Sequence, residues 1–238
     1  MDSLETELER ARELDETALA DAIEQIGFEC TRCGACCKGY ESDDETDHHE
    51  PHTATVFPDE VRELQDAGEY DWRDVARPMP YGLTQGDNGP EGETFEWALQ
   101  TDNCGDCSFY TEADGGTGRC SVHENRPLIC QTYPFSVALG GTTQPMGEAV
   151  DSVSLPAQRE AGKTGDETGM VRAHECEGLG GDISRSEAES LAGALKQRAI
   201  REIQEAIGVR DNYHPTESQD VVVYDSEGPK TTAGRPLE

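Results

Sequence analysis

Four cysteines stand within eight residues near the start of the chain, in the order Cys30-Thr-Arg-Cys33-Gly-Ala-Cys36-Cys37. A C-x-x-C spacing lets two thiolates converge on one ion around a tight turn, and Gly34 supplies the backbone freedom that such a turn needs. Adjacent Cys36 and Cys37 point in different directions and the flanking residues are polar, so packing in a core does not explain the run. The pattern therefore predicts metal ligation.

Two kinds of metal centre fit this run. The order C-x-x-C-x-x-C matches the first three ligand positions of the bacterial ferredoxin spacing, which favours an iron–sulfur cluster, of the 4Fe-4S type, completed by a distant cysteine. Structural zinc normally takes two C-x-x-C pairs separated by a linker, and the spacings here fit that arrangement less regularly. We expect an iron–sulfur cluster, with zinc as the alternative.

The remaining cysteines extend the pattern. They lie in Cys104-Gly-Asp-Cys107-Ser-Phe-Tyr, in Gly118-Arg-Cys120-Ser-Val-His123, in Arg126-Pro-Leu-Ile-Cys130-Gln-Thr-Tyr-Pro134-Phe and in Cys176-Glu-Gly-Leu-Gly180. Together with the first run, which follows Phe28, these stretches resemble the YkgJ-type cysteine cluster family, a zinc- or iron-chelating domain with a C-x-x-C-x-x-C-C signature. The last stretch is similar to the family's distal Cys-Pro-Gly-x-Gly element, with Glu177 in place of proline.

The resemblance spans Phe28 to Gly181 and implies a set of thiolate ligands. These are Cys30, Cys33, Cys36, Cys37, Cys107, Cys120, Cys130 and Cys176. Eight thiolates suffice for two four-coordinate centres, or for one cluster with unliganded thiols beside it, and both arrangements stay open. Cys104 falls outside the pattern, as a free thiol or a substitute ligand.

The Cys104-Gly-Asp-Cys107 stretch also has the spacing of a dithiol redox motif. In thioredoxin-like units such a motif opens a helix. The residues that follow Cys107 reach Gly115 and Gly116 too soon for that helix. We therefore expect no thioredoxin-type chemistry.

Cationic and imidazole side chains lie near the predicted ligands. Arg126 either neutralises part of an anionic thiolate cluster, which would raise its reduction potential, or forms a surface ion pair. His123 and His174 are each within three residues of a predicted ligand, and we expect them beside the ligands or at the surface rather than on the metal. The histidines at 48, 49 and 52 belong to an acidic stretch that we expect to be an exposed insertion.

Composition excludes several classes of partner. The chain has 50 acidic and 19 basic residues and a formal net charge of -31, so it has no general attraction to nucleic acid or to anionic lipid. This excess of acid is typical of proteins from halophilic archaea, in which molar salt shortens the Debye length to about 3 Å and screens self-repulsion. An acidic disordered chain is the alternative, because only 34% of the residues are hydrophobic.

The start of the chain and its hydropathy point to a cytoplasmic protein. The first residues lack the basic start and apolar run of a secretory signal, and no window approaches the roughly 20 apolar residues of a membrane helix. In a reducing cytoplasm, nine closely spaced cysteines are better explained as metal ligands or redox groups than as disulfides.

The helices and strands that must position the cysteines are predicted from the periodicity of apolar residues and from residues that end helices and strands. We expect helices over 4–26, broken near Leu14, over 58–67, and over 184–208 with a Ser184/Glu187 capping box. We expect a loop at 82–93, a strand at 94–100, a surface segment at 140–169 with at most a short strand or two, and a frayed tail from Asp211, in which Val221 to Tyr224 could add an edge strand.

The predicted fold class is α+β, as a small, irregular, helix-rich domain with a few short strands that is stapled by metal. We expect an N-terminal amphipathic helix (1–27), a cysteine cluster metal-binding domain (28–208) and a polar tail (209–238). The leading function is a metal-binding or iron–sulfur protein with a structural or electron-transfer role and an unknown protein or redox partner. The alternatives are a lysine methylase-like protein-modifying enzyme, which the cysteine run resembles, and a zinc-ordered interaction module for a basic partner.

The charge excess generates a prediction about salt. Dialysis from molar salt into dilute buffer removes the screening of the acidic surface and should unfold part of the chain. Circular dichroism would report this as a loss of helical signal. An unchanged spectrum across the dialysis would show that the chain does not depend on salt.

Overall fold

The computed structural model of the 238-residue chain describes residues 3–41, 49–86, 89–113, 115–139, 149–156, 170–218 and 220–237. The chain forms two compact units, one built from Met1–Cys33 and Cys130–Ile203 and the other from Gly34–Ile129 and Gln204–Glu238. We refer to these as unit 1 and unit 2. Both helices and sheets are present, which confirms the predicted α+β class. The domain boundaries expected after residues 27 and 208 stay a prediction.

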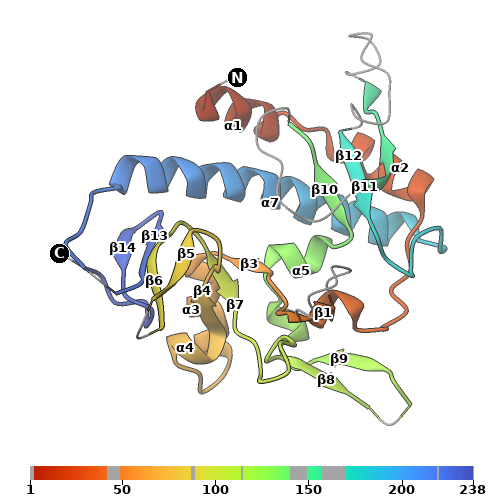
Figure 1. The fold of residues 1–238 in the computed structure, drawn as a ribbon. Helices are drawn as coiled ribbons and strands as arrows, with labels where there is room; N and C mark the ends of the chain where they lie inside the picture. The colour runs from red at the N-terminus through yellow and green to blue at the C-terminus, as the bar shows by residue number, and fades with distance from the viewer. Residues whose placement is uncertain are drawn as a thin grey trace. The chain divides into compact units, whose positions relative to one another are not determined.

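Unit 1 contains helices on a small antiparallel sheet (Figure 1). Its elements are α1 (Leu4–Arg12), α2 (Glu16–Ile26), the end of α5 (Leu128–Thr132), β10 (Phe135–Val137), β11 (Ala149–Val153), β12 (Val171–His174) and most of α7 (Arg185–Asn212). The strand order is β10-β12-β11, and α2 packs against β11 and β12. Leu19 and Ile23 of α2 are fully buried, as are Phe135 and Val171 of the sheet.

A buried cation fastens α7 to β10 in unit 1. The Arg198 guanidinium donates to Thr132 Oγ1 at 3.0 Å and to the Phe135 carbonyl at 3.2 Å, and it pairs with Glu202 at 2.5 Å. Burial raises the pKa of Glu202, while the charge of Arg198 and its hydrogen bond oppose that shift. A buried arginine with three partners of this kind fixes how the helix lies on the strand.

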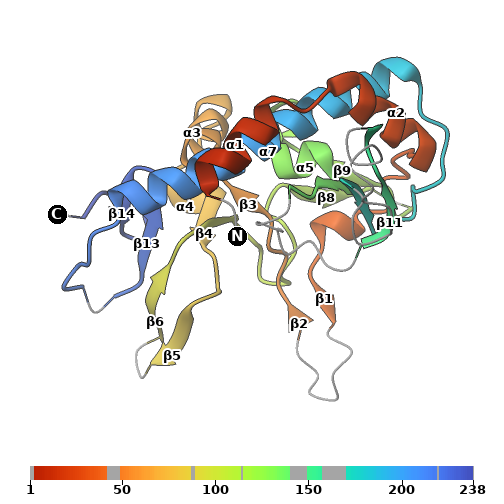
Figure 2. The same ribbon diagram turned by 90° about the horizontal axis from the view of Figure 1, so that it is seen from above.

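Unit 2 contains most of the strands. Its elements are η1 (Ala35–Cys37), β1 (Tyr40–Glu41), β2 (His49–Glu50), β3 (Thr55–Val56), α3 (Pro58–Ala67), α4 (Trp72–Val75), β4 (Ala76–Pro78), β5 (Leu83–Gly86), β6 (Gly89–Thr94), β7 (Trp97–Leu99), β8 (Tyr110–Glu112), β9 (Gly118–Cys120), η2 (His123–Asn125), β13 (Val222–Asp225) and β14 (Gly228–Lys230). The larger sheets have the orders β3-β7-β4 and β14-β13-β6-β5. Figure 2 shows β1–β2 and β5–β6 as two separate antiparallel ribbons.

The predicted helices are confirmed. The helical stretch at 4–26 is interrupted between Arg12 and Glu16, and Asp15 caps the second helix by accepting the Ala18 N–H at 3.0 Å. The helix at 58–67 has the predicted bounds. The capping box before α7 forms, because Glu187 accepts the Ser184 N–H at 3.0 Å, and the helix runs on to Asn212.

Two sequence predictions about strands are wrong. The stretch 82–93, expected to be a loop, forms the β5–β6 hairpin, because backbone pairing there does not depend on apolar side chains. The strand after Val221 is an interior strand between β14 and β6, with all four of its residues buried, so the tail is not frayed there. Of the surface segment at 140–169, residues 140–148 and 157–169 lie outside the described residues, and β11 lies between them.

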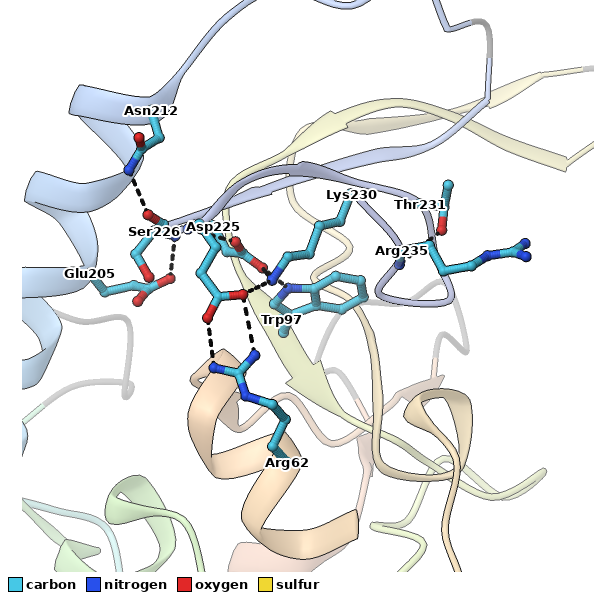
Figure 3. Close-up of polar contacts among 10 residues, drawn as sticks. Arg62, Trp97, Glu205, Asn212, Asp225, Ser226, Lys230, Thr231 and Arg235 are labelled. Carbon is cyan, nitrogen blue, oxygen red and sulfur yellow. Dashed lines mark hydrogen bonds and ion pairs between the residues drawn. The ribbon is translucent and has the colours of Figure 1, made fainter. Parts of the chain in front are cut away.

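Unit 2 is held at its core by a buried ion pair (Figure 3). Lys230 Nζ lies 2.8 Å from Asp225 Oδ2, and the two side chains are only 4% and 1% exposed. The same carboxylate oxygen accepts the Trp97 Nε1–H at 2.8 Å. Lys230 Nζ also lies 2.6 Å from Glu227, and the Glu227 carboxylate accepts bidentate hydrogen bonds from the Arg62 guanidinium. The network joins β7, β13, β14 and α3.

None of the helices in the described part of the chain has the length and apolar character needed to cross a bilayer.

The buried pair generates a prediction about stability. Lys230→Met leaves the Asp225 carboxylate buried without its counter-charge and should reduce the free energy of unfolding by about 3–5 kcal/mol. The matched control is Arg62→Ala, which breaks an exposed ion pair with Glu227 and should cost about 0–1 kcal/mol. Urea unfolding in high salt measures both values, and equal effects of the two substitutions would contradict the assignment.

Candidate metal centre

The cysteine run adopts a tight path that brings Cys36 and Cys37 into a turn of 3-10 helix, η1. Arg32 and Gly34, which precede that turn, have left-handed backbone conformations, with φ values of 59° and 78°. A side chain at Gly34 would collide with the Tyr110 ring, so glycine is required there both for its conformation and for space. The sequence assigned this role to Gly34 correctly.

The sequence argument that adjacent Cys36 and Cys37 point in different directions is wrong, because their side chains lie side by side in unit 2 with the Sγ atoms 3.8 Å apart. The hydrogen bond between these two thiols lowers the pKa of Cys36 to about 7, against the opposing effect of burial. The backbone N–H of Cys36 and the charge of Arg126 lower the pKa further. Thiolate is the form that binds metal, so this environment favours ligation.

Cys107 is fastened to the same turn. Its N–H donates to the Cys37 carbonyl at 2.8 Å across 70 residues of sequence. Burial raises the pKa of Cys107 to about 11, and the nearby charges of Cys120 and Cys36 add to the effect. The thiols of Cys36, Cys107 and Cys120 therefore lie close enough in unit 2 for their charges to interact.

Cys120 is placed by the β8–β9 ribbon. It pairs in register with Tyr110 of β8, and the Tyr110 N–H donates to the Cys107 carbonyl at 2.8 Å. Burial raises the pKa of Cys120, while the Arg126 charge lowers it. The ribbon is joined to the cysteine turn by an ion pair of 2.6 Å between Lys38 and Glu112.

Arg126 belongs to the environment of the thiols. Its charge acts on both Cys36 and Cys120, and its Nε donates to the His123 carbonyl at 3.2 Å. Both interpretations of Arg126, neutralisation of thiolate charge and a surface ion pair, stay predictions.

The other four predicted ligands, Cys30, Cys33, Cys130 and Cys176, belong to unit 1. The Glu29 N–H donates to the Gly178 carbonyl at 2.9 Å, and this backbone contact brings the residue before Cys30 to the loop after Cys176. The Gly178 N–H lies 3.5 Å from Cys176 Sγ and donates to it. The structure therefore divides the predicted ligand set between the two units.

Among the described residues, no three His, Cys, Asp or Glu side chains are grouped closely enough to hold a metal ion as they stand. Cys36 Sγ and Cys37 Sγ approach each other to 3.8 Å. The ligand set derived from the sequence therefore stays a prediction.

His52 is a residue that the sequence interpretation placed wrongly. It is only 8% exposed, and its imidazole hydrogen-bonds the backbone of Cys36. Burial lowers its pKa to about 4, with Arg77 adding to the effect, so the ring is neutral at pH 7. The His52 N–H donates to the Gly105 carbonyl, and Arg77 donates to the His52 carbonyl. Both partners are distant in the chain, so the polar sequence around His52 did not indicate that it is buried.

The other histidines take varied positions. His48 lies outside the described residues and His49 is exposed. His123 is exposed, with Nδ1 3.3 Å from Glu124 Oε1. His174 is buried in unit 1, with Nε2 2.8 Å from Ser136 Oγ.

Cys104 is exposed and sits in a turn with Cys107. The Cys104 N–H donates to Asp102 Oδ1 at 2.8 Å, Cys107 forms a β-bridge with Thr101, and no helix begins between Cys104 and Cys107. The structure confirms the expectation that this C-x-x-C pair does not open a helix.

The unequal thiol environments generate a prediction about reactivity. In metal-free protein, alkylation of Cys36 by iodoacetamide should rise with a midpoint near pH 7, since the thiolate is the nucleophile and the pKa of Cys36 is lowered to about 7. Cys107 should stay unmodified at neutral pH, because it is buried and its pKa is raised to about 11. Tandem mass spectrometry of the digested protein measures both rates.

The control for this reactivity is Cys37→Ala. It removes the hydrogen bond that contributes most to the lowered pKa of Cys36, so the midpoint should move to higher pH. A midpoint that stays in place in this variant would contradict the assigned cause.

Comparison with known proteins identifies the family. The model of the CxxCxxCC family, described as a "putative zinc- or iron-chelating domain", matches residues 29–177, which is more than half of the chain. No curated protein and no solved structure shows a significant match. The match supports metal binding by the cysteines in general, without distinguishing zinc from an iron–sulfur centre. The chain belongs to the CxxCxxCC family.

Proposed function

We propose that this protein binds metal through thiolates and that Cys36, Cys37, Cys107 and Cys120 of unit 2 hold a tetrahedral metal centre. The observation that carries the proposal is the 3.8 Å separation of Cys36 Sγ and Cys37 Sγ. Cys107, which donates a backbone hydrogen bond to Cys37, and Cys120, whose charge acts on Cys107, are the thiols that would complete the centre.

The separation of the two sulfurs favours ligation of one ion by both. Zinc–thiolate bonds of about 2.3 Å in a tetrahedron place two ligand sulfurs about 3.8 Å apart. A four-iron cluster held by four cysteines takes one thiolate per iron, so two adjacent cysteines would have to reach different corners of the cluster. The geometry thus supports zinc or another single ion at this site over the four-iron cluster expected from the sequence spacing.

The environment of the thiols suits such an ion. Four thiolates around a divalent ion carry a net charge of -2, and the Arg126 charge that acts on Cys36 and Cys120 offsets part of it. When bound, the ion supplies cross-links among the η1 turn, the Cys107 turn and β9, which otherwise rest on a few hydrogen bonds. We infer that its role is structural, because binding free energy then becomes folding free energy.

An iron–sulfur centre with an electron-transfer role is the second candidate. It is favoured by the ferredoxin-like order of Cys30, Cys33 and Cys36 in the sequence. A two-iron cluster takes two cysteines per iron, so Cys36 and Cys37 on the same iron would also agree with their separation.

The proposal predicts the composition and the metal dependence of the purified protein. Protein prepared without oxygen in high salt should be colourless and contain zinc in stoichiometric amount. Iron with labile sulfide and a visible absorption band would instead support the second candidate. Protein that is folded and contains neither metal would contradict both.

Removal of the ion should also destabilise the fold. Incubation with a strong chelator should lower the free energy of unfolding by several kcal/mol, and restoring zinc should recover it. Urea unfolding followed by circular dichroism measures the change. Identical unfolding curves with and without chelator would contradict a structural role.

A further inference from the structure

The eight predicted ligands fall into two equal groups in the folded chain. Cys36, Cys37, Cys107 and Cys120 belong to unit 2, while Cys30, Cys33, Cys130 and Cys176 belong to unit 1. The division cuts the C-x-x-C-x-x-C-C run between Cys33 and Gly34, so a single run contributes one pair of thiols to each unit. A four-coordinate thiolate centre needs four ligands, and each unit contains that number.

Contacts inside unit 1 bring together the segments that carry its four cysteines. Phe28 forms a β-bridge with Leu179, and the Gly180 N–H donates to the Gly27 carbonyl at 3.0 Å. The Thr31 hydroxyl lies 3.4 Å from Glu177 Oε2. These contacts surround Cys30 on one segment and Cys176 on the other, so the two cysteines occupy neighbouring loops.

Cys130 is tied to the same region through the end of α5. The Tyr133 hydroxyl, three residues after Cys130, donates to the Glu175 carbonyl, and the His174 N–H donates to the Pro134 carbonyl at 2.9 Å. The two residues directly before Cys176 are therefore hydrogen-bonded to the segment that follows Cys130. The edge-to-face contact of Phe28 and Phe135, with ring centroids 5.8 Å apart, adds an apolar link between the segments.

Two local features lie beside these thiols. The Gly178 N–H donates to Cys176 Sγ, a contact of the type that stabilises sulfur when it carries negative charge. Arg32, between Cys30 and Cys33, has left-handed backbone at φ 59°, which a residue with a side chain rarely adopts. The chain thus turns inside this C-x-x-C pair, and a turn there is compatible with two ligands of one ion.

We propose that Cys30, Cys33, Cys130 and Cys176 form a second thiolate centre for a divalent metal, with a ligand set distinct from that of the unit 2 centre. This inference rests on the proposed function, because it assigns the remaining thiols of the same metal-binding protein. It selects two four-coordinate centres over one cluster with unliganded thiols.

The two groups of ligands can be removed separately. Cys130→Ser with Cys176→Ser disables the unit 1 set, Cys107→Ser with Cys120→Ser disables the unit 2 set, and Cys104→Ser is the matched control outside both. Metal content per chain is measured by mass spectrometry of protein purified in high salt, with folding checked by circular dichroism. We expect about two ions per chain in the wild type and in the control, and about half of that in each double variant.

Two outcomes would overturn the second centre: loss of all metal in either folded double variant, which indicates one shared centre, or full metal content without Cys130 and Cys176. Metal-free wild-type protein would instead defeat the proposed function itself, so the two failures are distinguishable.

Cadmium-113 NMR of the wild-type protein gives an answer that does not depend on the variants folding. Two resonances in the range of four-sulfur ligation are expected after cadmium loading, and a single resonance would overturn the second centre.

Discussion

Hydrogen bonds between residues far apart in sequence link the segments that carry the cysteines. In unit 2 the Cys107 N–H reaches the Cys37 carbonyl at 2.8 Å, and in unit 1 the Glu29 N–H reaches the Gly178 carbonyl at 2.9 Å. Each such bond contributes only about 1 kcal/mol net, which is small against the entropy of ordering several loops. A metal ion coordinated by these thiols would join the same segments and would add to the stability that these bonds provide.

Two of the few cations of this acidic chain lie where salt has little effect. Arg198 in unit 1 and Lys230 in unit 2 are both buried, each with carboxylate partners. Buried ion pairs are screened much less than exposed ones, so these contacts persist in molar salt. Arg126 is half-buried, and its charge acts on the thiols of Cys36 and Cys120.

Sequence reasoning predicted the helices better than the sheets and the surroundings of the cysteines. Local signals sufficed for the helices, as in the Ser184 capping box, whose partner lies three residues away. The β5–β6 hairpin at 82–93 was missed because glycine and acidic residues there resemble a loop. The strand after Val221 was expected at an edge, and its interior position was missed because its neighbour β6 is far away in the chain. His52 and the division of the cysteines between two units depend on contacts of the same long range, which no local pattern encodes.

The central claim is that thiolates alone surround the metal and that Cys36 and Cys37 share one ion. X-ray absorption at the edge of the bound metal tests it most directly, because it reports the elements and distances around the ion. A first shell of four sulfurs at about 2.3 Å without a nearby metal neighbour is the predicted result. A first shell of nitrogen and oxygen, or a strong metal–metal contribution, would contradict it.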